Sequence, residues 1–244
     1  MEPIIRFENI YKHFDEKIVH NGISLSIYKG EILTLMGGSG SGKSVLLRSL
    51  IGLEKPDRGN IYFGEIDIAQ LSESELVSIR KKIAYVFQNG ALFDSLTVEE
   101  NLAYPLIEHT DLTPEQIENK IKITLSKIGL AGSEKLLPSD LSGGMQKRVG
   151  VARSIIMDPE VVLYDEPTSG LDPFNTRQIL KIIVQLKKHG TTSILVTHDM
   201  TSLFSVTDRI AFLKDGKIKA LGTASEIKNH TDRTVTAFIS GEDY

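Results

Sequence analysis

The chain of 244 residues contains no cysteine, so it can form neither a disulfide bond nor a thiolate metal site, and no thiol can act as a nucleophile. This absence fits a reducing compartment. An excess of positive charge is also missing, because 32 acidic residues outnumber 28 lysines and arginines and leave a formal net charge of -4. Proteins whose main partner is a nucleic acid usually carry the opposite sign. We therefore expect no nucleic-acid partner.

Long hydrophobic runs are absent as well. The longest stretches without a charged residue are 18–28, 32–42 and 83–93, and each is much shorter than the roughly 20 apolar residues that cross a bilayer. The first six residues lack the basic segment and apolar core of a secretory signal. Hydrophobic residues make up 41% and charged residues 25% of the chain, as in ordinary globular proteins. The sequence thus predicts a globular, cytoplasmic chain that does not span a membrane.

Short apolar strands and amphipathic helices alternate along most of the chain. Strands are predicted at 4–7, 22–27, 31–36, 60–63, 83–87, 161–164, 193–197 and 209–214, and helices at 45–51, from Pro114 onward, at 142–157 and from Pro173 onward. This order predicts an α/β fold in a single domain, 1–244. About 1–89 and 159–244 would form the core and an N-terminal antiparallel β subdomain. A helical subdomain would be inserted at about 90–158.

Residues 37–44, Gly-Gly-Ser-Gly-Ser-Gly-Lys-Ser, match the pattern G-x-x-x-x-G-K-[ST] between a predicted strand and a predicted helix. Glycines let consecutive backbone N–H groups turn toward phosphate, and the helix N-terminus adds its positive end. Lys43 would reach the β- and γ-phosphates, and the Ser44 hydroxyl would bind Mg²⁺, which prefers oxygen ligands. A flexible Gly/Ser loop is the alternative. The expected nucleotide contacts are Gly37, Gly38, Ser39, Gly40, Ser41, Gly42, Lys43, Ser44 and Val45.

Two carboxylates, Asp165 and Glu166, follow the apolar strand predicted at 161–164. A strand tip beside a phosphate loop is where a metal-linked aspartate belongs, so we expect Asp165 to hold Mg²⁺, through water. We expect Glu166 to act as the general base that polarises the water attacking the γ-phosphate. Without the phosphate loop, the pair would be interpreted as a solvated strand end.

A third segment, 141–145, has the sequence Leu-Ser-Gly-Gly-Met at the start of a predicted helix. Ser142 and the backbone N–H groups of Gly143, Gly144 and Met145 would form an anion site. In isolation this segment would be an N-capped helix without a ligand. Here the segment does not stand alone, because the two carboxylates and a lone histidine, His198, follow it.

These motifs together resemble the nucleotide-binding subunit of ABC transporters, and the resemblance covers essentially the whole chain. The residues that carry it, in that family's order, are Lys43, 141–145, 165–166, 169–172 and His198. Two further positions match: Gln88 corresponds to the glutamine of the Q-loop, and Tyr11 to the aromatic residue that stacks on adenine. The resemblance implies a RecA-like P-loop NTPase core of the ABC ATPase type, with ATP and Mg²⁺ bound and ATP hydrolysed.

The family resemblance further implies that two copies pack head to tail and hold each ATP between Lys43 of one copy and Ser142 of the other. Asp172 would couple the two sites across the dimer interface, a role compatible with capping the helix that Pro173 opens. Met145 stands where the family usually has glutamine. Because the backbone of the preceding residues makes the phosphate contacts, activity is expected to survive this difference.

By the same resemblance, Gln88 would contact Mg²⁺ or water and report to a membrane subunit, and His198 would hydrogen-bond the γ-phosphate. The other histidines have no partner pattern and are interpreted as surface or packing residues. They are His13, His20, His109, His189 and His230.

Residues 87–98, with Asn101 and 105–106, are similar to the MlaF-type ATPases of the Mla/Mce phospholipid transport systems. This closer resemblance implies an integral membrane permease as partner, with an MCE-domain lipid-binding protein and a small regulatory subunit as further candidates. The chain would then lie peripherally at the cytoplasmic face of the inner membrane. The apolar stretch 91–93 fits a helix-in-groove contact with the permease, or alternatively a packed loop core.

Three other functions are kept as alternatives. The same ATPase could drive a permease for lipoprotein release or another small solute. A soluble ABC ATPase acting on DNA or ribosomes is disfavoured by the net charge and by the short insert between the phosphate loop and residue 141. A nucleotide sensor without hydrolysis would need a damaged catalytic set, and none is seen. At the C-terminus, Val235, Phe238 and Ile239 could pack on a partner copy or on the chain's own core.

Overall fold

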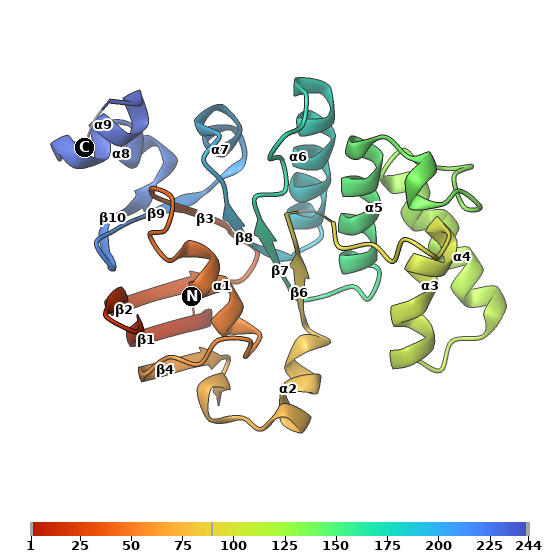
Figure 1. Cartoon of the computed structure of the whole chain (residues 1–244), viewed down its shortest axis with the longest axis horizontal. Coiled ribbons are helices and arrows are strands. Elements are labelled where there is room, and N and C mark those ends of the chain that lie inside the picture. Colours follow the sequence, from red (N-terminus) through yellow and green to blue (C-terminus); the bar gives the residue numbers. More distant parts are fainter. Residues whose placement is uncertain (1, 89, 243–244) are drawn as a thin grey trace.

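The computed structural model describes residues 2–88 and 90–242, so Asn89, inside the segment 87–98 discussed above, lies outside the described residues. Within the described residues the strands form a four-stranded sheet, in the order β2-β1-β4-β5, and a six-stranded sheet, in the order β10-β9-β3-β8-β7-β6. Figure 1 shows the smaller sheet at one side of the molecule and a group of helices at the other. The predicted α/β architecture is therefore confirmed.

The smaller sheet is antiparallel. It consists of β1 (Pro3–Phe14), β2 (Lys17–Tyr28), β4 (Arg58–Phe63) and β5 (Ile66–Asp67). The first two strands are much longer than the predicted 4–7 and 22–27, because β1 continues to Phe14 and turns back through Asp15, which has a φ of 50°. Polar residues near the hairpin tip have little intrinsic preference for a strand. Pairing between β1 and β2 nevertheless holds them in the strand conformation. The extension carries the hairpin tip to the phosphate loop.

The larger sheet has a parallel core. It consists of β3 (Ile32–Met36), β6 (Ile83–Val86), β7 (Val161–Asp165), β8 (Thr192–Val196), β9 (Arg209–Lys214) and, antiparallel to β9, β10 (Lys217–Thr223). Every residue of β3 and β8 is buried, as expected for strands covered on both faces. Because β3, β7 and β8 are parallel, their carboxyl ends meet at one edge, and the loops that follow them lie together.

Helices cover both faces of this sheet. Their bounds are α1 (Lys43–Leu50), α2 (Glu73–Arg80), α3 (Val98–His109), α4 (Pro114–Lys127), α5 (Gly143–Ile155), α6 (Pro173–Lys188), α7 (Met200–Val206), α8 (Ala224–Lys228) and α9 (Arg233–Ser240), with short 3-10 turns η1 (Ile68–Gln70) and η2 (Pro138–Asp140). Helix α1 lies between the two sheets, since Leu46 and Leu47 share one hydrophobic cluster with residues of both. Helices α3, α4 and α5 pack on one another beside β6 and α6 and are here called the helical lobe (Figure 1).

The C-terminal segment packs on the chain's own core. Val235 of α9 is fully buried, and the ring of Phe238 lies 5.2 Å from that of Phe212 in β9. Ile239 packs on the same cluster. This resolves the open alternative for these side chains in favour of intrachain packing. Among the described residues, no helix combines the length and apolar character needed to cross a bilayer.

Candidate nucleotide-binding site

The phosphate loop, residues 37–44, connects β3 to α1 and has a backbone that only glycine can adopt at two positions. Gly37 has a φ of 152°, and a Cβ there would lie 2.3 Å from the carbonyl oxygen of Leu213. Gly42, which precedes α1, has a φ of 96°, and a Cβ would lie 2.7 Å from Nε2 of His20. The glycines therefore let the loop close tightly over β9 and the first hairpin.

The Lys43 side chain is buried within this loop. Its ammonium donates hydrogen bonds to the carbonyl oxygens of Gly37, at 2.7 Å, and Gly38, at 2.8 Å, and to Ser41 Oγ at 3.3 Å. Burial lowers the pKa of Lys43, and the nearby carboxylates of Glu166 and Asp165 oppose that shift. The ammonium is thus held where the loop would surround a phosphate group.

His20 is hydrogen-bonded to the phosphate loop. This histidine is 1% exposed, and its Nε2 lies 3.0 Å from the Gly42 carbonyl oxygen, which also accepts the Leu46 N–H at 2.9 Å. Since a carbonyl can only accept, Nε2 carries the proton of this bond. Burial lowers the pKa of His20 below its ordinary value, so the ring favours its neutral form. The sequence interpretation of His20 as a packing residue agrees with this placement.

Ser44 and Asp165 meet at the carboxyl edge of the larger sheet. Ser44 Oγ donates to Asp165 Oδ1 at 2.8 Å, and the Tyr85 hydroxyl donates to Asp165 Oδ2 at 2.8 Å. Burial raises the pKa of Tyr85, and the Asp165 carboxylate adds to that rise. Hydroxyl and carboxylate oxygens are the donors that Mg²⁺ prefers, so Ser44 and Asp165 fit the ion that the sequence predicts here. Tyr85 was not anticipated from the sequence.

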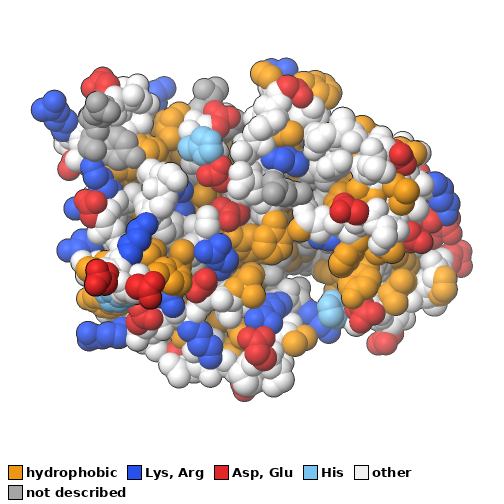
Figure 2. Space-filling model, viewed as in Figure 1, with side chains coloured by type: hydrophobic (Ala, Val, Ile, Leu, Met, Phe, Trp, Pro, Cys, Tyr) orange, Lys and Arg blue, Asp and Glu red, His pale blue; other side chains and the backbone are white. Residues whose placement is uncertain are grey.

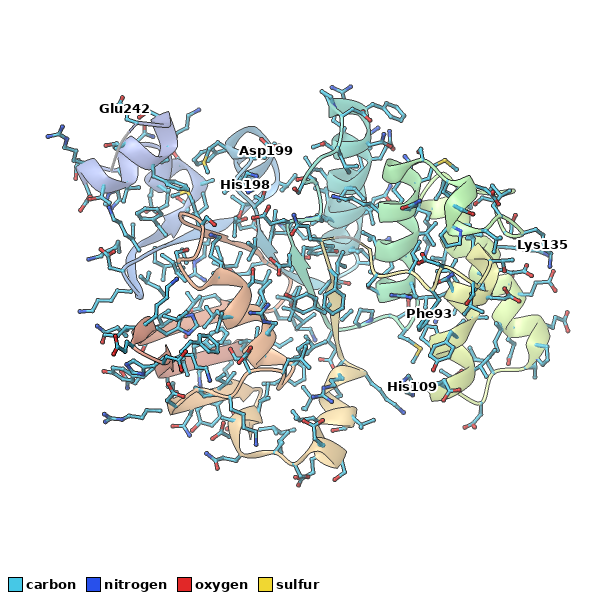
Figure 3. The ribbon with its side chains drawn as sticks, in the orientation of Figure 1. Phe93, His109, Lys135, His198, Asp199 and Glu242 are labelled. Atoms are coloured by element: carbon cyan, nitrogen blue, oxygen red, sulfur yellow. The ribbon has the colours of Figure 1, made fainter. Side chains whose placement is uncertain are left out.

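Glu166 and His198 contact each other beside the loop. Glu166 follows β7 with a φ of 51°, and its backbone N–H bonds to the Val196 carbonyl at 2.9 Å. Its Oε2 lies 3.0 Å from His198 Nδ1. Figure 3 shows His198 at the end of β8, before α7. A non-glycine residue in the left-handed region at a strand end is the type of backbone feature found at functional sites.

A hollow of about 300 Å³ opens above the phosphate loop. Its walls are formed by Phe14, Lys17, Val19, Ser39, Gly40, Gly42, Lys43, Ser44, Val45 and Glu166. We call this space the nucleotide hollow. It brings six of the nine predicted nucleotide contacts, Lys43 among them, and the predicted general base to one cavity, whereas Gly37, Gly38 and Ser41 do not line it.

Phe14, and not Tyr11, is the aromatic residue at this hollow. Tyr11 lies earlier on β1, where the Arg58 guanidinium covers its ring at 5.3 Å and its hydroxyl approaches Gly22. Phe14 stands at the hairpin tip and is 41% exposed. The sequence-based assignment of the adenine contact to Tyr11 therefore disagrees with the geometry. An exposed aromatic residue next to the turn at Asp15 was the signal that could have identified Phe14.

The segment 141–145 lies in the helical lobe and contributes nothing to the walls of the nucleotide hollow. Ser142 is the N-cap of α5 and accepts the Met145 N–H at 3.4 Å. Ser142 and Gly143 are exposed, whereas Gly144 is buried, and a Cβ there would collide with Asn175. Ser142 is thus available to another molecule and not to the chain's own phosphate loop.

Gln88 and Asp172 lie outside the hollow as well. Gln88 Nε2 donates to Ser169 Oγ at 3.3 Å, and the Lys147 ammonium donates to the Ser169 carbonyl. Asp172 caps α6 by accepting the N–H groups of Phe174, at 2.8 Å, and Asn175, at 3.0 Å. The capping role predicted for Asp172 is confirmed. Both residues are exposed in the single chain.

The sequence and the structure are both similar to those of known proteins. Residues 20–169 match the ABC transporter family. The chain is 36% identical over 242 residues, 99% of its length and 92% of the relative's, to the intermembrane phospholipid transport system ATP-binding protein MlaF of Haemophilus influenzae. It is 37% identical, over 99% of its length and 70% of the relative's, to the probable ribonucleotide transport ATP-binding protein mkl of Mycobacterium leprae. A dimeric ATP-binding cassette solved in a post-hydrolysis state with ADP and Pi superposes with a TM-score of 0.83 at 33% identity, over 90% of this chain and 98% of that one.

Proposed function

The chain belongs to the ABC transporter family, and from this premise we propose that it is the ATP-hydrolysing subunit that drives a separate membrane permease for phospholipid or a related lipid. One observation carries the enzymatic part of the proposal. The Glu166 carboxylate lines the same hollow as the Lys43 ammonium and contacts His198 at 3.0 Å. The groups proposed as base and phosphate-binding cation therefore share one cavity, and the residue proposed to orient the base contacts that base directly.

In the proposed reaction the loop N–H groups and Lys43 hold the β- and γ-phosphates of ATP. Glu166 polarises the attacking water, and His198, whose Nδ1 contacts the Glu166 carboxylate, would hydrogen-bond the γ-phosphate. Ser44 and Asp165 would hold Mg²⁺, which supplies positive charge to the phosphates when bound. Gln88, at the end of β6, would contact that ion or water once the two lobes approach each other.

We further propose that a second copy of the chain completes each site. Ser142 begins α5 in the helical lobe and is exposed, and the nucleotide hollow contains no residue of 141–145. A head-to-tail partner would bring its Ser142 and the N-terminus of its α5 to the γ-phosphate. Asp172, exposed at the start of α6, would then lie at the dimer interface.

The permease is proposed to dock in the groove between the core and the helical lobe. This space of about 420 Å³, here called the inter-lobe groove, is lined by Ile51, Val77, Arg80, Lys81, Ile83, Ala84, Tyr85, Phe87, Pro105, His109, Arg153, Ser154, Met157 and Pro159. Figure 2 shows hydrophobic side chains gathered between the lobes, and Figure 3 labels His109 at the rim. Such a groove fits an apolar helix of a membrane subunit at the cytoplasmic face of the inner membrane.

Within the apolar stretch 91–93, one residue is packed in the loop core and another is exposed. Leu92 packs on the core of the helical lobe, whereas Phe93 is 44% exposed, with its ring 5.2 Å from that of Tyr104 and the Arg153 guanidinium 5.1 Å from its centre. Arg153 also lines the inter-lobe groove. We therefore propose that Phe93 extends the docking surface while Leu92 holds the loop to the lobe.

The cargo is tested by what accompanies the chain in its own cells. Mild-detergent purification followed by mass spectrometry should recover a permease and a protein with an MCE-type lipid-binding domain, with or without a small regulatory subunit. A permease of another type would keep the ATPase and overturn the lipid assignment in favour of lipoprotein or another solute, such as the ribonucleotide in the name of the mycobacterial relative. Recovery of ribosomes or DNA-repair proteins without any membrane protein would overturn the transporter assignment itself.

Phe14 is proposed to stack on the adenine ring. Phe14→Ala should weaken ATP binding about tenfold, since base–aromatic stacking contributes roughly 1–3 kcal/mol per base. Tyr11→Ala is the matched control, because it removes an aromatic ring from the same strand outside the nucleotide hollow. Calorimetric titration with a non-hydrolysable ATP analogue measures both. Weaker binding in Tyr11→Ala, with Phe14→Ala unchanged, would return the role to Tyr11.

A further inference from the structure

Tyr85, in the middle of β6, contacts three functional parts of the molecule at once. Its hydroxyl donates to Asp165 Oδ2 at 2.8 Å. Its ring lies 4.5 Å from the Phe87 ring, and both residues line the inter-lobe groove. Its carbonyl oxygen lies 3.2 Å from Ser154 Oγ of α5, whose single hydroxyl proton is shared with the Gly150 carbonyl at 3.0 Å. One residue therefore connects the metal-side carboxylate, the groove and the helical lobe.

The hydroxyl determines how the Asp165 carboxylate is oriented. Ser44 occupies Oδ1 and Tyr85 occupies Oδ2, so each oxygen has its own donor. With both oxygens bonded, rotation of the carboxylate would break a charge-assisted hydrogen bond. Loss of the Tyr85 hydroxyl would leave one oxygen free and the rotation less restricted.

The ring lies where an occupant of the groove would touch it. Phe87 is 44% exposed and packs directly against the Tyr85 ring. A ligand that displaces Phe87 would therefore also displace the Tyr85 ring through van der Waals contact. The shared hydroxyl of Ser154 also places the Tyr85 backbone against α5, the helix capped by Ser142. Movement of the lobe or filling of the groove would therefore displace the hydroxyl that Asp165 accepts.

We propose that Tyr85 is a positioning residue that couples the inter-lobe groove to the Mg²⁺-binding carboxylate of Asp165. The inference rests on the proposed function for the identity of the groove's occupant, but the coupling itself belongs to this chain. It predicts that the Mg²⁺ dependence of nucleotide binding responds to changes in the groove, and that this response requires the Tyr85 hydroxyl.

The first test compares ATP-analogue binding by the full chain with and without Mg²⁺. Tyr85→Phe should weaken binding with Mg²⁺ about tenfold, the scale of one hydrogen bond to a charged group, and leave binding in EDTA unchanged. Tyr62→Phe is the matched control, since Tyr62 is also a half-buried strand tyrosine but lies in the smaller sheet beside Arg6. Equal Mg²⁺ dependence in Tyr85→Phe and wild type, or an equal loss in EDTA, would overturn the positioning role.

The second test is a double-mutant cycle with Phe87→Ala, which changes the groove without touching Asp165. In the wild-type background Phe87→Ala should alter the Mg²⁺-dependent affinity about threefold, as expected for a displaced hydrogen bond that is weakened and not lost. In the Tyr85→Phe background it should have no further effect. Additive effects, or no effect of Phe87→Ala in wild type, would overturn the coupling. Neither test involves a permease, so failure of the proposed transport function would be seen separately in the co-purification.

Discussion

Glu166→Gln is expected to bind ATP with Mg²⁺ normally and to lower turnover at least about 100-fold, the scale of losing a catalytic proton acceptor. The amide has the shape of the carboxylate, but it cannot accept a proton from the attacking water. The Lys43 ammonium, the phosphate loop and the Ser44–Asp165 pair are left in place, so the substrate-binding contacts remain. ATP should therefore accumulate on the enzyme and hold two copies together.

Steady-state ATPase assays measure the turnover, and size-exclusion chromatography with ATP measures the trapped dimer. Glu160→Gln is a matched control just before the start of β7, where Glu160 forms an ion pair with Lys82 at 3.4 Å and both side chains are about half exposed. This control should keep wild-type turnover. Undiminished turnover in Glu166→Gln would remove Glu166 from the role of general base.

The parallel core of the fold was predictable because its signals are local. The strands β3, β7, β8 and β9 are apolar runs bounded by turns or glycines, and each was placed within one or two residues of its observed bounds. The N-terminus of α4 was also correct, since Thr113 and Gln116 form the expected capping box. Signals of this kind depend on residues that are adjacent in sequence, so they can be recognised without knowing the tertiary contacts.

Among the missed elements, the first hairpin depends on strand pairing, whereas α2 and α3 have local start signals. Most of the first hairpin was missed because its polar outer half is held as strand by pairing, which Asn9 interrupts with a φ of 50°. Helices α2 and α3 were not predicted, although Ser72 and Thr97 begin them with capping boxes. Pro105 inside α3 obscured the helical pattern, because proline disfavours helix interiors.

In the candidate site, sequence motifs identified the functional residues that lie in loops. They did not identify the residues that strand pairing places beside those loops. Lys43 and Glu166 line one hollow, as the motif spacing predicted. Phe14 was missed because its position depends on the length of the first hairpin. Tyr85 was missed because its bond to Asp165 connects neighbouring strands that are far apart in the chain, a pairing that no motif records.

The proposed dependence of each site on two copies predicts an equally large effect on turnover. Lys43→Ala removes the ammonium that would face the phosphates, and Ser142→Arg adds bulk and charge at the partner's γ-phosphate. Each homodimer should lose nearly all turnover, because both of its sites carry the lesion. Ser142 is exposed, so arginine fits the free chain at the cost of an N-cap, about 1 kcal/mol. The Ser142→Arg chain should therefore still bind ATP as a monomer.

Mixed dimers distinguish a shared site from a site within one chain. When one copy carries Lys43→Ala and the other Ser142→Arg, head-to-tail packing places both lesions in one site and leaves the other intact, so up to about half of wild-type turnover should return. The matched control pairs wild type with a chain that carries both substitutions. It contains the same two lesions, but each site now has one, and turnover should remain absent.

The two kinds of mixed dimer can be isolated by placing a different affinity tag on each copy and purifying on both tags in sequence. If each chain instead formed a complete site by itself, the control dimer would keep the activity of its wild-type copy, and the first mixed dimer would have none. The two models therefore predict opposite results from dimers of the same composition. The opposite result would also show that Ser142 does not act in the site of a second copy. The exposure of its hydroxyl and of the N-terminus of α5 in the single chain would then have no role in catalysis.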